Sequence, residues 1–423
     1  MAPLRALPLL ILTLGLAVPA DAAVRLTTSV NGSIVEVAWP ANAFPLRYTA
    51  DQRLLNALPD GHRMLDRAFG AWAEVPETRV RFAAQAVGSA LQPGKNGVNT
   101  ITLADDLYAN QRAIAITTNW DQNGTLIESD IQVDASLIRS AFNIEQAITH
   151  EVGHLLGLDH SGVLSAVMFP YVSRGEHDVV LDSDDRVAIA AIYPQTSVAG
   201  GTLRGRVMGD AGGIFAAQVV AVNELGEPVA TALTDPAGDF TLQGVPDGTY
   251  RLYAEPLDGP VDTRNLSPYW RLAEVASFPT EFHRGEPVRV SNGKVYGNLI
   301  VNTVGTVDLN PRWVGSTKAG GSIFTLTSTA AVARAGETIA LAVAGDGLHP
   351  GVTTFDVLNP SVRRISPFRY AANYVYADFE IAADAPSGSA VILVERPPYT
   401  AALTGALRVQ SLDTPSRRRL ARR

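Results

Sequence analysis

The sequence contains no cysteine among its 423 residues. Disulfide bonds and thiolate metal sites are therefore excluded, and the folded chain must rely on packing and on bound ions for its stability. A basic charge is missing too, because the formal net charge at pH 7 is −8. Proteins that bind nucleic acid normally present a basic field, so nucleic acid is not an expected partner. Beyond the start of the chain, no apolar run is long enough to predict a transmembrane segment.

The start of the chain has the features of a signal peptide at residues 1–22. Arg5 supplies the positive charge, Leu7 to Val18 form the apolar run, and Ala20-Asp21-Ala22 is a small-x-small cleavage site. A membrane anchor is the alternative, but the apolar run is too short to span a bilayer comfortably. The sequence therefore predicts export with cleavage, giving a secreted or extracellular protein that could associate with the cell surface.

The most informative stretch runs from His150 to His160 and reads HEVGHLLGLDH. His150 and His154 are four residues apart, so on a helix both imidazoles project from one face and reach one metal ion. Gly157 can adopt the left-handed conformation that ends a helix, after which the chain turns back and delivers His160 as a third ligand. Three imidazoles around Zn²⁺ leave a coordination position open for water, which is typical of catalytic sites. Glu151 is placed to take a proton from that water.

Together with Met168 downstream, this stretch has the HExxHxxGxxH pattern and the methionine turn of the metzincins. Ser161, directly after the third histidine, is the residue that matrixins carry at that position. From about Val37 to Pro194 the chain resembles a bacterial matrixin, a relative of the matrix metalloproteases. The resemblance implies an α+β catalytic domain and a zinc metalloendopeptidase that hydrolyses extended protein or peptide substrates.

Several elements of this domain can be predicted. The resemblance implies a first strand, a first helix and a closing helix at Phe44–Tyr48, Met64–Trp72 and Leu181–Tyr193. Alternating apolar and polar residues predict strands at 79–82, 99–103, 113–118 and 126–133. Asn123-Gly124 marks a hairpin turn between the last two, and Asn143 is the expected cap of the active-site helix. By resemblance, strand 113–118 is the edge strand above the cleft, where its free backbone groups would pair with a substrate.

The resemblance also implies roles for individual residues. Glu151 would be the catalytic base, and Met168 a structural floor beneath the zinc ligands His150, His154 and His160. The wall of the substrate pocket would include Ala115, Pro170, Tyr171 and Val172. For the stretch that starts at Pro170, a plain surface turn is the alternative.

Four carboxylates have two interpretations each. Asp184 and Asp185 resemble the paired aspartates that tie the closing helix to the methionine turn and to the chain start. Charges at a helix N-terminus explain them equally well. Asp130 and Asp134 could contact Ca²⁺, but solvated loop carboxylates are the favoured interpretation.

The number of zinc ions follows from where histidine is missing. Many animal matrixins hold a second, structural zinc with three histidines and an aspartate ahead of the active-site helix. No histidine lies between His62 and His150 here, and His177, His283 and His349 are isolated in sequence. We therefore expect one catalytic zinc per chain, with calcium as the one further ion to consider. The absence of cysteine also excludes the thiolate latch of many animal matrixins.

The rest of the chain predicts a multidomain protein, with an α+β metzincin (zincin-like) catalytic domain at 23–194 followed by two all-β sandwich domains. A small, glycine-rich stretch at 195–202 reads as a linker. Residues 203–304, the first module, resemble a carboxypeptidase regulatory-like sandwich, and residues 305–410, the second module, an immunoglobulin-like one of the IPT type. Either surface could bind protein or glycan. Residues 411–423 read as a basic, disordered tail.

One alternative function is a catalytically retired metzincin scaffold that only presents the two modules, as a cell-surface or extracellular binding protein. The intact Glu151 argues against this alternative, because a retired enzyme commonly loses its base first. Since all proposed site residues precede the linker, residues 23–194 are expected to fold and cleave short peptides by themselves.

Overall fold

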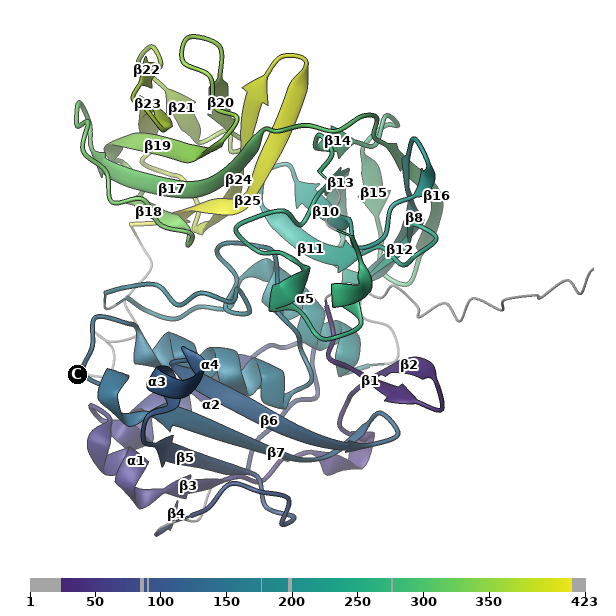
Figure 1. Cartoon of the computed structure of the whole chain (residues 1–423), viewed down its shortest axis with the longest axis vertical. Coiled ribbons are helices and arrows are strands. Elements are labelled where there is room, and N and C mark those ends of the chain that lie inside the picture. Colours follow the sequence, from purple (N-terminus) through teal and green to yellow (C-terminus); the bar gives the residue numbers. More distant parts are fainter. Residues whose placement is uncertain are drawn as a thin grey trace, which may run out of the picture.

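The computed structural model describes residues 24–83, 87–89, 91–175, 177–196, 200–274 and 277–412. The predicted signal peptide and residues 413–423 of the predicted tail lie outside the described residues. The chain folds into an α+β part with two β-rich parts above it (Figure 1). No helix among the described residues is both long and apolar enough to cross a membrane.

The α+β part is built on one sheet with strand order β4-β3-β5-β7-β6. These strands are β3 (Thr49–Asp51), β4 (Val87–Gly88), β5 (Thr100–Ala104), β6 (Ala115–Gln122) and β7 (Thr125–Asp134). All neighbours run parallel except β6, which pairs antiparallel with β7 and forms the edge of the sheet. Asn123 and Gly124 join these two strands with φ of 55° and 85°, the left-handed pair of a tight hairpin turn. The predicted hairpin and its edge strand are confirmed.

Helices cover this sheet and meet over an apolar core that includes Trp72, Ile148 and Ile131. The helices are α1 (Gln52–Ala57), α2 (Gly61–Ala73), α3 (Leu107–Gln111), α4 (Ile144–Leu155) and α5 (Ser183–Ile192). Short 3-10 turns lie at Ala41–Ala43 and Ala135–Leu137, and a hairpin of β1 (Thr27–Val30) and β2 (Ser33–Glu36) precedes the sheet. The predictions for α2, the active-site helix α4 and the closing helix α5 are confirmed.

Two of the predicted strands are wrong. Leu46 and Phe82 form an isolated bridge, and neither Phe44–Tyr48 nor Arg79–Phe82 is a strand; the sheet begins later, at Thr49. The two segments do pair at this one position, since the Leu46 N–H donates to the Arg81 carbonyl at 2.9 Å and the Ala83 N–H donates to the Leu46 carbonyl at 2.8 Å. Their aromatic side chains pack on α2. Tyr48 stacks on Phe69 with 3.9 Å between ring centroids, and Phe82 meets the same Phe69 ring edge-on at 4.9 Å. The two segments therefore have the alternation of strands, but they pair at a single bridge and do not continue into a longer ladder.

The first module holds two sheets that share one apolar core, with Val219, Phe240 and Leu252 among its members. Its strands are β8 (Gly201–Gly209), β9 (Gly212–Gly213), β10 (Gln218–Asn223), β11 (Pro228–Leu233), β12 (Asp239–Val245), β13 (Gly248–Glu255), β14 (Glu281–Phe282), β15 (Val288–Val290) and β16 (Val295–Asn302). The long β13–β14 connection carries two 3-10 turns, η3 (Thr263–Asn265) and η4 (Trp270–Leu272). Strand β8 starts at Gly201, so the predicted linker 195–202 ends too late by two residues.

The second module also has two sheets around one core, which includes Leu341, Phe355 and Phe379. Its strands are β17 (Asn310–Lys318), β18 (Ala331–Arg334), β19 (Thr338–Asp346), β20 (Thr354–Val357), β21 (Val362–Arg364), β22 (Arg369–Tyr370), β23 (Tyr374–Ile381), β24 (Gly388–Arg396) and β25 (Tyr399–Gln410).

The three parts pack directly against one another, and α5 lies at their junction (Figure 1). Leu164 and Phe169, from the loop after the histidine motif, belong to the apolar core of the second module and are 4% and 1% exposed. Val187 of α5 belongs to the core of the first module. Burial of these side chains in the modules means that the modules complete the packing of the α+β part.

Candidate metal centre

Helix α4 places the metal-binding residues and is held by side chains from elsewhere in the domain. The Asn143 side chain caps the helix by accepting the Gln146 N–H at 3.1 Å, as predicted. Trp72 Nε1 donates to the Thr149 carbonyl at 2.8 Å, and Trp39 Nε1 donates to the Leu155 carbonyl at 2.8 Å. Two buried indoles therefore fix both the middle and the end of the helix.

Gly157 turns the chain at the end of α4. Its φ is +92°, and a Cβ there would lie 2.7 Å from the Val37 carbonyl oxygen, so both conformation and space favour glycine. The Leu158 N–H then returns to the Gly153 carbonyl at 3.1 Å. This reversal carries His160 back toward the helix, as the motif predicts.

His150, His154 and His160 converge, and one ring nitrogen from each lies within 4.8 Å of the others. Each Nδ1 contacts a backbone carbonyl: Val167 for His150 at 2.7 Å, Leu158 for His154 at 2.8 Å, and Asn265 for His160. Since a carbonyl can only accept, each Nδ1 carries a proton, and in the neutral imidazole the Nε2 then keeps its lone pair. Three bare lone pairs are thus directed to one place.

This arrangement fits a zinc ion. His154 Nε2 and His160 Nε2 are 3.3 Å apart with no proton for a hydrogen bond between them. Tetrahedral zinc with Zn–N bonds of about 2.0–2.1 Å separates its nitrogen ligands by about 3.3–3.4 Å. Burial and the neighbouring imidazole lower the pKa of His150 to about 3, and burial also lowers the pKa of His154. These two rings are therefore neutral at pH 7, the state in which imidazole binds a metal.

Glu151 lies beside these ligands and is 6% exposed. The hydroxyl of Thr117, on the edge strand β6, donates to Glu151 Oε2 at 2.7 Å. Burial raises the pKa of Glu151 from 4.5 to about 7, while the bond from Thr117 acts in the opposite direction. A carboxyl with a pKa near neutrality can both take and return a proton. Thr117 had no signal in the sequence beyond its place on the predicted edge strand.

Met168 packs against Gly153 of helix α4, and its role as a structural floor for the zinc ligands stays a prediction. It is 2% exposed, and a Cβ on Gly153 would collide with its sulfur and lie 2.9 Å from the Trp72 ring. Gly153, the glycine inside the histidine motif, therefore permits the Met168 side chain to pack closely against α4.

The four residues predicted for the substrate pocket differ in solvent exposure. Ala115, at the start of β6, is buried, and Tyr171 is 42% exposed with its ring edge-on to Phe169 at 5.7 Å. Pro170 and Val172 are half-buried. One cavity lies away from these four residues and is lined by Gly162 and by residues of both modules. The pocket assignment stays a prediction.

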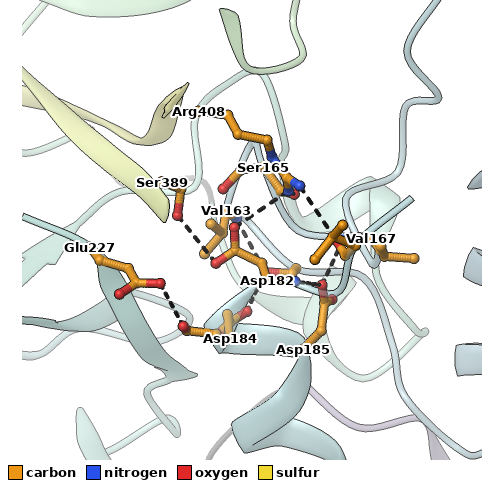
Figure 2. A network of polar contacts seen from close by, with 12 residues as sticks. Val163, Ser165, Val167, Asp182, Asp184, Asp185, Glu227, Ser389 and Arg408 are labelled. Atoms are coloured by element: carbon orange, nitrogen blue, oxygen red, sulfur yellow. Dashed lines mark hydrogen bonds and ion pairs between the residues drawn. The ribbon is translucent and has the colours of Figure 1, made fainter. Parts of the chain in front are cut away.

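Asp185 connects α5 to the methionine turn, the first of the two interpretations given above. Its carboxylate accepts the Val167 and Met168 N–H groups at 2.8 and 3.0 Å (Figure 2). Asp184 does not reach toward the chain start among the described residues. It accepts the hydroxyls of Ser161 at 2.7 Å and of Thr231, from the first module, at 2.9 Å.

The same end of α5 binds both modules. Ser183 Oγ donates to Glu227 of the first module at 2.6 Å, and Ser389 of the second module donates to Asp182 at 3.2 Å (Figure 2). Arg408 of the second module lies 3.6 Å from Asp182 and donates to the Ser165 carbonyl. Buried carboxylates of α5 therefore tie the α+β part to both modules.

Titration of Asp184 predicts a pH-dependent contribution to stability. Burial raises its pKa to about 6, against the two hydroxyl bonds. Between about pH 4 and 6 the carboxyl of Asp184 is still protonated in the folded protein but already ionised in the unfolded chain. The contribution of Asp184 to the free energy of unfolding is therefore complete below about pH 4 and is lost as the pH rises through about 6. Relative to the parent, Asp184→Asn should gain stability between about pH 4 and 7. Denaturant unfolding of the zinc-free protein at several pH values measures the free energy of unfolding. Asp247→Asn, at an exposed position, is the control and should follow the parent. A free energy of unfolding that depends on pH in the same way for the parent and for Asp184→Asn would refute this prediction.

Asp130 and Asp134 are not solvated, so the favoured interpretation as solvated loop carboxylates is wrong. Both are fully buried, and Asp130 accepts the Gly94 and Thr100 N–H groups at 2.7 and 2.8 Å. Asp134 accepts Tyr108 N–H at 2.6 Å and further groups of the turn that follows β7. Backbone N–H groups thus donate to both carboxylates, and a calcium ion there stays a prediction.

Residues 48–194 match the matrixin family. Metalloendoproteinase 2-MMP of Arabidopsis thaliana is 29% identical over 171 residues, which cover 37% of this chain and 43% of that protein. The hatching enzyme of Paracentrotus lividus is 38% identical over 150 residues, which cover 32% of this chain and 23% of that enzyme. Karilysin of Tannerella forsythia is 40% identical over 75 residues, which cover 18% of this chain and 12% of karilysin.

The chain thus spans less than half the length of these relatives. The residues that match the matrixin family, 48–194, include the three histidines. The comparison agrees with the geometry of α4, Gly157 and Met168 described above. Residues 48–194 are therefore a matrixin-like metzincin catalytic domain.

Proposed function

We propose that the protein is a secreted zinc metalloendopeptidase that cleaves extended polypeptides. The observation that carries this proposal is the set of three Nε2 lone pairs, from His150, His154 and His160, each fixed by a carbonyl on its Nδ1. Zinc bound there would supply Lewis acidity that activates water and polarises the scissile carbonyl.

The proton transfers are assigned to Glu151. Thr117 occupies Oε2 of this carboxylate, which leaves Oε1 to take the proton of the attacking water and return it to the departing amine. Burial raises the pKa of this carboxyl in the metal-free protein, which favours its acting as a proton carrier. Glu151 is the catalytic base in this proposal, and Thr117 orients it.

The edge strand β6 is assigned to substrate binding. Among the described strands β6 pairs only with β7, so its outer side is open to an added strand. An extended peptide paired there would lie beside Thr117 and hence beside Glu151. In this binding mode the enzyme recognises the backbone of the substrate more than its side chains. The mode therefore fits protein or peptide substrates of varied sequence.

A non-catalytic scaffold is not favoured. Glu151 accepts a hydrogen bond from Thr117 and follows His150, one of the three converging histidines, and a scaffold would need none of these contacts. Casein zymography of the full chain tests the proposal: clearing without a chelator and no clearing with one is expected. Equal clearing with and without chelator, or none in either lane, would overturn it.

We further expect one zinc per chain. Apart from His150, His154 and His160, no group of three or more metal-ligating side chains was found among the described residues. Elemental analysis of dialysed protein should give one equivalent, lost in His154→Ala. Two equivalents, with one retained in that variant, would refute the single site.

A further inference from the structure

The loop between β13 and β14 of the first module reaches the third histidine of the metal centre. The backbone carbonyl of Asn265, at the end of η3, accepts the His160 Nδ1–H. The carbonyls that orient His150 and His154 belong to the catalytic domain, at Val167 and Leu158. One of the three ligands is thus oriented by a residue more than a hundred positions downstream, in a different part of the chain.

We propose that Asn265 is a positioning residue of the metal centre, so that the first module forms part of the zinc site. A carbonyl on Nδ1 fixes the tautomer and ring orientation of a ligand and raises its basicity, and losing such a partner typically costs roughly 10–100-fold in metal affinity. The inference rests on the proposed zinc-dependent function.

The loop is built to hold this carbonyl in place. Asn265 Oδ1 accepts the Asp262 N–H at 3.0 Å, and the Asn265 N–H donates to the Asp262 carbonyl at 2.9 Å. The Asp262 carboxylate also accepts the Arg264 N–H at 2.8 Å. These reciprocal bonds close the turn on itself, so the direction of the Asn265 carbonyl does not depend on His160 alone.

Two further contacts anchor the loop beside His160. The Ser267 N–H donates to Asp159 Oδ2 at 2.8 Å, and the other oxygen of Asp159 accepts the His160 N–H at 2.8 Å. One buried carboxylate therefore connects the loop to the backbone of the third ligand.

Apolar packing on the far side of the loop completes the attachment. Leu266 and Trp270 are 2% and 6% exposed and cluster with Val24, from the start of the described chain. The Val24 carbonyl in turn accepts the Asp159 N–H at 2.8 Å. The loop, the N-terminal segment and the stretch before His160 thus form one packed unit, and this unit determines where the third imidazole lies.

The test loosens the turn without touching a ligand. Asp262→Ala/Asn265→Ala removes both side chains of the reciprocal cap in the full-length protein, and Leu272→Ala, on the same loop but 74% exposed, is the matched control. Zinc dissociation constants are measured by competition with a chromophoric chelator. The absorption spectrum of the cobalt(II)-substituted protein reports the geometry of the histidine ligands, which a general loss of stability would leave unchanged in the folded molecules.

We expect roughly tenfold weaker zinc binding, or more, and an altered cobalt spectrum in the double variant, with Leu272→Ala equal to the parent. A folded double variant with the parent's zinc affinity and spectrum would overturn the role of Asn265 and leave the proposed function standing. A parent protein without tight zinc would instead overturn the proposed function. If the double variant does not fold, the single variant Asn265→Ala is judged by the same two measurements.

Discussion

Replacing Glu151 with alanine is expected to lower kcat/KM for peptide cleavage by roughly 10²–10⁴-fold, the usual contribution of a general base. Zinc binding should persist, because Glu151 is not among the three ligands. The folded state should persist as well, since the variant removes a buried carboxyl whose burial raises its pKa to about 7. Steady-state hydrolysis of a fluorogenic peptide, with zinc content measured on the same samples, provides the comparison.

Glu77→Ala is a suitable control, because Glu77 is an exposed glutamate of the same domain. It should leave both hydrolysis and zinc content at the level of the parent. Hydrolysis by Glu151→Ala within severalfold of the parent would show that another group moves the proton.

Removal of residues 195–423 is expected to unfold the catalytic domain or leave it as a poorly packed, aggregating species. This outcome is opposite to the one expected from the linker in the sequence. Leu164, Phe169 and Val187 are buried in the cores of the modules and would all face water in the fragment. Burial of such a side chain contributes about 1.5–3 kcal/mol each, so the three together approach the usual 5–15 kcal/mol stability of a domain.

Solubility, near-ultraviolet circular dichroism and denaturant unfolding of residues 23–194 would measure this effect. Phe169→Ala in the full-length protein is the milder test at one position, with an expected loss of about 3–5 kcal/mol in the free energy of unfolding. Tyr171→Ala, two residues away and 42% exposed, is the matched control with a small expected effect. A soluble, cooperatively unfolding and active fragment would contradict the structural role of the modules.

The parts of the site that the sequence predicted are the ones set by local rules. Residues four apart on a helix, a glycine that ends it and an Asn-Gly hairpin all depend on backbone geometry within a few positions. These rules predicted α4, the reversal at Gly157 and the hairpin of β6 and β7, while the edge position of β6 was implied by the resemblance to matrixins. They also predicted which imidazoles converge.

Long-range contacts could not be predicted in this way. The acceptor for His160 lies at Asn265, and a backbone carbonyl has no residue-type signal in a sequence. Burial of Leu164 and Phe169 in another module was equally hidden, because an apolar loop residue indicates burial without indicating the partner. The strand predicted at Arg79–Phe82 was wrong because this segment pairs with Leu46 at a single bridge, and an alternating pattern does not indicate how far such pairing extends.

The central claim is that the three histidines hold a zinc ion with which Glu151 cuts internal peptide bonds. The most direct test is mass spectrometry of a denatured protein substrate after incubation with the full-length protein. We expect new internal termini that disappear on chelation, return with one equivalent of added zinc, and are missing in parallel digests with Glu151→Ala. Zinc bound at one equivalent by a folded parent protein that generates no internal termini in any condition would contradict the account.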